Sequence, residues 1–177
     1  MHVKTMHRPD TPGAIHAIVP IKKLSKCKSR LSRFLSLADR RRLVLAMIND
    51  VLTILAEHPY ISEITVISGD SLTLAPEITE FVQVIDEKQL ETVGSGLNPI
   101  LAAGLEFVSK NSDSDFLVLH SDLPLLSSDD ITSTVEQLSG EYDLVLGADS
   151  QEEGTNLFAF RSGVRPKFCF GPSSLQA

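Results

Sequence analysis

The sequence has only two cysteines among its 177 residues, and they stand far apart, at positions 27 and 169. Without a CxxC pair or a histidine partner they form no zinc motif, and a disulfide is not expected in a reducing compartment. No apolar run reaches the about 18 residues that a membrane span needs, because Asn49 and Asp50 interrupt the longest candidate, residues 43–55. The first residues contain no apolar stretch typical of a secretory signal. These absences predict a cytoplasmic protein that has no contact with a membrane.

Two common nucleotide-binding motifs are also missing. No GxxxxGK[ST] sequence occurs, which disfavours P-loop chemistry, and Gly94-Ser-Gly96-Leu-Asn98-Pro99 has a proline where a dinucleotide fingerprint has its third glycine. The net charge is −7, yet 11 of the 16 lysine and arginine residues lie within residues 1–42. An acidic chain with one basic segment does not resemble a general nucleic-acid binder. The pattern indicates a protein that handles one small polyanion at one place.

The order of apolar segments predicts an α/β protein. Residues 1–13 are polar and are expected to be a disordered lead, and residues 14–177 are expected to form a single domain. Ser36 and Asp39 resemble a capping box that begins a helix. The face of this helix that we expect to be buried carries Leu43, Met47, Val51, Ile54 and Leu55. Further helices are predicted at 97–110 and 128–138, and strands at 14–20, 63–68, 81–86, 116–120, 142–146 and 157–160.

Apolar strands separated by amphipathic helices are typical of a doubly wound, mostly parallel sheet with helices on both faces. Ligands of such sheets bind at the carboxyl ends of the strands. Functional residues are therefore expected directly after each apolar run.

A basic segment follows the first predicted strand. It places five cations within nine residues: Lys22, Lys23, Lys26, Lys28 and Arg30. These charges repel one another unless an anion lies between them, and arginine and lysine are the usual partners of phosphate groups. The segment therefore predicts a triphosphate site, with a solvated basic loop as the alternative.

Asp122 follows the strand predicted at 116–120 and precedes Pro124. Magnesium usually takes one or two protein carboxylates and completes its shell with phosphate oxygens and water. Asp122 is therefore a candidate magnesium ligand, although an aspartate that begins an ordinary turn has the same sequence.

Three glycine-containing segments are weaker signals. Gly96 and Asn98 precede a predicted helix, where a glycine lets the backbone approach a base or ribose and the asparagine supplies hydrogen bonds. Gly154-Thr-Asn156 and Gly171-Pro-Ser-Ser174 are turns of the kind that can form an anion cradle. Each segment is equally compatible with an ordinary turn.

In combination, the motifs VPIK…KSRL, GLNP, SDLPL, GTNLFAF and FGPSS resemble the phospholactate and phosphoenolpyruvate guanylyltransferases of coenzyme F(420) biosynthesis. The resemblance extends over residues 15–174. It implies a GT-A-like (nucleotide-diphospho-sugar transferase) fold, related to molybdopterin nucleotidyltransferases, with GTP and a small phosphorylated acid as substrates and Mg²⁺ as cofactor. The implied roles are triphosphate binding and catalysis for Lys22, Lys28 and Arg30, magnesium binding for Asp122, nucleoside contact for Gly96 and Asn98, and acceptor binding for Thr155, Gly171 and Ser174.

The family pattern continues beyond FGPSS with a helix and an acidic closing strand, whereas this sequence stops at Ala177. Without these elements a strand edge would be exposed, which is a liability. The chain is therefore expected to self-associate as a homo-oligomer or to be marginally stable, and to turn over GTP poorly. Asp149 and Glu153 are the nearest candidates for a second metal carboxylate. Two alternatives stay open. One is another nucleotidyltransferase, acting on a molybdopterin or sugar phosphate, and the other is a non-catalytic relative that binds a nucleotide or only a partner protein.

Overall fold

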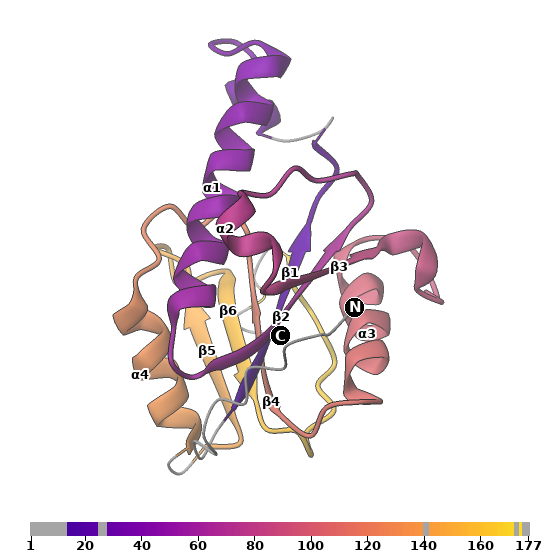
Figure 1. The fold of residues 1–177 in the computed structure, drawn as a ribbon, viewed down its shortest axis with the longest axis vertical. Coiled ribbons are helices and arrows are strands. Elements are labelled where there is room, and N and C mark those ends of the chain that lie inside the picture. The colour runs from indigo at the N-terminus through magenta and orange to yellow at the C-terminus, as the bar shows by residue number, and fades with distance from the viewer. Residues whose placement is uncertain (1–13, 25–27, 140–141, 172–173, 175–177) are drawn as a thin grey trace.

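The computed structural model describes residues 14–24, 28–139, 142–171 and 174. Residues 1–13, predicted to be a disordered lead, lie outside these ranges, as do Lys26 and Cys27 of the basic segment. The described strands form one six-stranded sheet in the order β3-β2-β1-β4-β6-β5 (Figure 1).

The sheet is mostly parallel, as predicted. Strands β1 (Ile15–Ile21), β2 (Ile61–Ser68), β3 (Val82–Asp86) and β4 (Asp115–Leu119) run parallel. Strand β6 (Thr155–Phe160) is antiparallel to β4 and to its other neighbour, β5 (Leu144–Ala148).

Strand β1 includes Pro20 and ends one residue later than predicted. Its pairing with β4 reaches only Ile18, whereas its pairing with β2 continues to Ile21. Pro20, which has no N–H to donate, therefore lies where only one neighbouring strand is paired, and the sheet tolerates it there.

Helices cover both faces of the sheet, which confirms the predicted layers (Figure 1). Helices α1 (Leu37–Glu57) and α4 (Ser128–Ser139) pack on one face, against residues such as Val19 and Leu117. Helix α3 (Leu97–Ser109) packs on the other face, against Ile18 and Phe116. Alternate residues of β1 and β4 thus enter opposite cores, as the two-residue period of a strand requires. Short helices complete the fold: η2 (Ser29–Leu31), α2 (Pro76–Thr79) and η3 (Glu87–Gln89).

Helix α1 begins as predicted, and its buried face agrees with the prediction in part. The hydroxyl of Ser36 accepts a hydrogen bond from the Asp39 N–H at 3.1 Å, which confirms Ser36 as the N-cap. Met47, Val51 and Leu55 are buried as predicted. Leu43, also predicted to be buried, is 38% exposed, whereas Val44 and Ile48 are buried. The apolar arc of this helix is so wide that periodicity alone does not locate its centre.

Strand β5 lies at the edge of the sheet. Its Val145 packs against the core beneath α1 and α4, while Leu144 and Leu146 are exposed on the opposite face. Among the described residues, no helix has both the length and the apolar character that crossing a membrane would require.

Candidate active site

The carboxyl ends of the parallel strands gather the chemically active side chains at one edge of the sheet. In the register of the sheet, Ile21 aligns with Ser68, and Ile18 aligns with Val118. The segments that follow β1, β2 and β4 therefore leave the sheet at the same edge, where ligands of such sheets bind.

The basic segment and Asp122 meet at this edge. The ammonium of Lys28 lies 2.8 Å from Oδ2 of Asp122, although the two residues are 94 positions apart in the sequence. The Asp122 side chain is still 47% exposed, so it remains accessible to a further ligand. Lys28 has a left-handed backbone (φ 41°) immediately before η2, which carries the exposed Arg30.

The charges around Asp122 favour its ionised form. Partial burial raises the pKa of this carboxyl group, but the hydrogen bond and charge of Lys28, with smaller effects of His120 and Lys22, outweigh burial and hold the pKa below its ordinary value. Lys22 is therefore close enough to Asp122 for its charge to act on that carboxyl group. Asp122 is a carboxylate at neutral pH.

His120 connects Asp122 to strand β6. Burial lowers the pKa of His120, the charge of Lys22 lowers it further, and the charge of Asp122 and a hydrogen bond to the Thr155 backbone oppose these effects without cancelling them. The backbone N–H of His120 also donates to the carbonyl of Asn156 at 3.1 Å. The imidazole is therefore neutral at pH 7. It lies between the predicted metal ligand and the predicted acceptor residues.

Sequence reasoning missed Asp70, which follows β2. Its carboxylate accepts a hydrogen bond of 2.6 Å from the N–H of Leu24, in the basic segment. Its own N–H donates to the hydroxyl of Ser68 at 3.2 Å. Asp70 thus holds the start of the basic segment against the end of β2. The rule that functional residues follow apolar strands would have found it, but Ser-Gly-Asp also has the composition of an ordinary turn.

Two of the three predicted acceptor residues are in direct contact. The N–H of Thr155 donates to the hydroxyl of Ser174 at 2.9 Å, and that hydroxyl donates to Oγ1 of Thr155 at 3.2 Å. Gly171, the third, has φ 150°, a backbone conformation that residues with a side chain rarely adopt.

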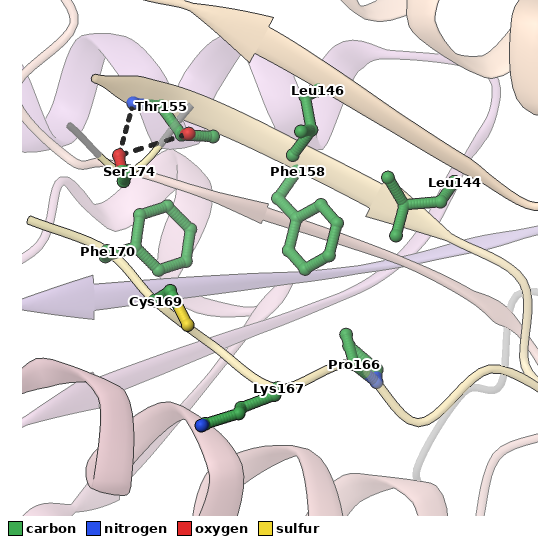
Figure 2. Close-up of a pocket in the computed structure, with 9 residues that line it drawn as sticks. All are labelled: Leu144, Leu146, Thr155, Phe158, Pro166, Lys167, Cys169, Phe170 and Ser174. Atoms are coloured by element: carbon green, nitrogen blue, oxygen red, sulfur yellow. Dashed lines mark hydrogen bonds between the residues drawn. The ribbon is translucent and has the colours of Figure 1, made fainter. Parts of the chain in front are cut away.

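Thr155 and Ser174 line a pocket of about 220 Å³. Figure 2 shows them at one end of this pocket, beside Phe170, with Leu144 and Pro166 at the other end. The pocket therefore has a polar end made of hydroxyl groups. Its remaining wall is contributed by β5, β6 and residues 166–170, and it is mostly apolar but includes Lys167.

Gly96 and Asn98 stand where α3 begins. Gly96 is the N-cap, with φ 103°, a conformation that favours glycine. The Asn98 amide donates to the carbonyl of Phe170 at 3.1 Å and accepts from the N–H of the same residue at 2.9 Å. The ring of Phe170 in turn meets that of His120 edge-on, with 5.3 Å between the ring centres. Together with the Lys28–Asp122 and Thr155–Ser174 contacts, these contacts connect the five predicted site segments into one group.

Asp149 forms hydrogen bonds within its own turn. Its carboxylate accepts hydrogen bonds of 3.1 Å from the N–H groups of Gln151 and Glu153, which lowers its pKa and closes the turn between β5 and β6. In the described part of the chain, no group of three or more histidine, cysteine or acidic residues is arranged to hold a metal ion. The single carboxylate of Asp122 is nevertheless compatible with magnesium, which needs only one or two.

A mostly parallel sheet with one reversed strand, and with a basic segment after its first strand, is the nucleotide-diphospho-sugar transferase fold. The fold resembles a putative nucleotide-diphospho-sugar transferase from Desulfovibrio desulfuricans G20, with a TM-score of 0.66 and 17% identity over 89% of this chain and 66% of that one. Residues 15–173 match the family described as guanylyl transferase CofC like, and the chain belongs to this family.

Curated relatives agree with the family. A phosphoenolpyruvate guanylyltransferase of Roseiflexus sp. (strain RS-1) is 38% identical over 91% of this chain and 68% of its own length. A 2-phospho-L-lactate guanylyltransferase of Methanocaldococcus infernus is 32% identical over 81% of this chain and 59% of its own length. Both relatives are guanylyltransferases, so this chain belongs to the nucleotidyltransferase class of enzymes.

Proposed function

We propose that this protein condenses GTP with 2-phospho-L-lactate or phosphoenolpyruvate, releasing pyrophosphate, in the cytoplasmic synthesis of coenzyme F(420). The names of the relatives support the nucleotide and both acids. The observation that carries the proposal is the Lys28–Asp122 pair at the strand ends, connected through His120 to the Thr155–Ser174 end of the pocket. The basic segment would bind the triphosphate, and the pocket would bind the acid.

Asp122 would hold Mg²⁺ in this proposal. Only its Oδ2 is bonded to Lys28, its side chain is nearly half exposed, and its pKa is low enough to keep it ionised. When bound, Mg²⁺ would supply positive charge that offsets the negative charge of the phosphates. Lys22, Lys28 and Arg30 would add fixed positive charge at the same edge.

The proposed reaction needs no general base. The second pKa of a phosphate monoester is about 6, so the acceptor phosphate is mostly a dianion at neutral pH. One of its oxygens attacks the α-phosphorus of GTP. A bond forms between that oxygen and the α-phosphorus, the bond from the α-phosphorus to the oxygen bridging it to the β-phosphorus breaks, and pyrophosphate leaves with both electrons of the broken bond.

The main difficulty of this reaction is the approach of two anions. Lys28 would bind the triphosphate and stabilise the charge that develops on the leaving pyrophosphate. Thr155, Ser174 and the backbone at Gly171 would orient the acid with hydroxyl and N–H donors. These residues bind and position the substrates, and none of them has to accept a proton.

Mass spectrometry of the products tests the proposal. The protein is incubated with Mg²⁺ and GTP, CTP or ATP, each combined with either acid. We expect a guanosine adduct and pyrophosphate only with GTP, and no adduct from Asp122→Asn. An adduct formed only with another nucleotide would indicate a different nucleotidyltransferase. Binding of GTP without any adduct would indicate a non-catalytic relative.

A further inference from the structure

We propose that Asn98 is a positioning residue for the acceptor acid, and that its role is to fix the segment which carries Gly171 and Ser174. This inference rests on the proposed function and assigns Asn98 to the acceptor half of the site, whereas the sequence resemblance implies contact with the nucleoside. It is carried by the two hydrogen bonds between the Asn98 amide and the backbone of Phe170.

The side-chain amide of Asn98 holds the Phe170 backbone through both of its polar groups, an arrangement called the clamp below. Asn98 Oδ1 accepts from the Phe170 N–H at 2.9 Å, and Nδ2 donates to the Phe170 carbonyl at 3.1 Å, across 72 positions of sequence. An asparagine side chain has one acceptor oxygen and one NH₂ group, and both are used here. The contact is partly buried, and its geometry specifies both partners. The Asn98 amide is therefore directed toward the backbone of residues 168–171.

The clamp determines where the acceptor residues lie. Phe170 immediately precedes Gly171, so the clamp fixes one end of the acceptor segment. At the other end, Ser174 is fixed by its two bonds with Thr155. The Phe170 ring also packs against the rings of His120 and Phe158, and this packing further restricts the position of the clamped backbone. Loss of the clamp would leave the segment held only by the packing of the Phe170 ring and by the bonds between Ser174 and Thr155.

The same clamp connects the acceptor segment to helix α3. Asn98 is the second residue of α3, whose buried residues pack in the core that contains Phe168. The helix is anchored by that core, so it forms a rigid support for the acceptor segment. Loops that carry binding groups on a rigid scaffold are a common way to build a site.

The experiment compares Asn98→Ala with a matched control, Asn49→Ala. Asn49 also makes two backbone hydrogen bonds with its amide, to the carbonyl of Leu45 and from the N–H of Ala75, each at 2.8 Å. The control therefore removes the same kind of interaction from the contact between α1 and the start of α2. Steady-state kinetics give KM for each substrate and kcat. Hydrogen exchange measures protection of the Phe170 N–H.

For Asn98→Ala we expect KM for the acid to rise about tenfold, while KM for GTP stays within about twofold. The kcat at saturating acid should be largely retained. Hydrogen exchange of the Phe170 N–H should become faster. Asn49→Ala should change none of these. An unchanged KM for the acid, or an equal rise in KM for GTP, overturns the inference.

A second variant covers the case in which Asn98→Ala does not fold. Asn98→Asp keeps the acceptor for the Phe170 N–H but loses the donor, and it should raise KM for the acid at both low and high salt. A KM restored by salt would mean that the new charge repels the acid, and it would overturn the clamp. If the wild-type protein forms no adduct at all, the proposed function is wrong. If the wild-type protein is active and the Asn98 variants have unaltered KM values, only the inference about Asn98 is wrong.

Discussion

Substitution of Lys28 by methionine separates stability from nucleotide binding. The Lys28–Asp122 pair is partly exposed, with 31% and 47% of the two side chains accessible. Pairs of this kind contribute about 0–1 kcal/mol to stability. For a domain of this size, that corresponds to a shift in unfolding temperature of at most about 4 °C. Lys28→Met should therefore stay folded.

Binding of GTP should respond much more strongly. If Lys28 contacts the β- or γ-phosphate, its removal deletes a hydrogen bond between charged groups, which contributes about 1.5–3 kcal/mol. The dissociation constant for GTP should then rise about 10- to 150-fold. The constant for GMP, which lacks the outer phosphates, should change much less.

Calorimetry at one fixed salt concentration tests this, because screening is then the same in every titration. Lys110→Met is the matched control, since Lys110 pairs with Glu106 at 4.0 Å at the end of α3. The control should bind GTP like the wild type. Equal losses of GTP and GMP affinity in Lys28→Met, or no loss of either, would refute the assignment of Lys28 to the triphosphate.

Three further predictions concern other parts of the molecule. Asp122→Asn should lose magnesium-dependent GTP binding and keep its circular dichroism spectrum; unchanged binding would remove Asp122 from the site. Burial holds the pKa of His16 below its ordinary value, with Glu63 opposing, so the unfolded chain binds the proton more tightly and stability should fall as pH drops below about 6.5. Urea titrations should show a smaller fall for His16→Gln, and an identical pH dependence would contradict this. The exposed apolar side chains of β5 should cause self-association, detected by light scattering and suppressed by Leu144→Lys with Leu146→Glu; a wild-type monomer at high concentration would exclude it.

The fold could largely be predicted because the apolar runs are short and well separated. The apolar run of β1 and the sequence that becomes β4 leave few alternatives to buried parallel strands. The predicted buried face of α1 was partly wrong because ten of the thirteen residues from 43 to 55 are apolar, so that several faces fit the same period. Only packing against the sheet determines that Val44 is buried and Leu43 exposed.

Candidate site residues could be named from the sequence, but the contacts between them could not. Asp122 and Thr155 are recognisable from local motifs, whereas the Lys28–Asp122 and Asn98–Phe170 contacts join residues 94 and 72 positions apart. Such contacts depend on the order of strands in the sheet, which local pattern does not specify. The roles of all the predicted site residues toward substrates and metal stay predictions: Lys22, Lys28, Arg30, Gly96, Asn98, Asp122, Thr155, Gly171 and Ser174.

The contacts around the site share one physical feature. The basic segment is held by the carboxylate of Asp70 on the N–H of Leu24, and the acceptor segment is held by Asn98 on the backbone of Phe170. In both cases a polar side chain at the edge of a rigid element bonds the backbone of a loop. A side chain in this position stabilises one loop conformation without enlarging the core, so its removal should alter substrate affinity more than global stability. The two anchors act on different loops, and the loss of each should therefore be selective: Asp70 for the nucleotide and Asn98 for the acid.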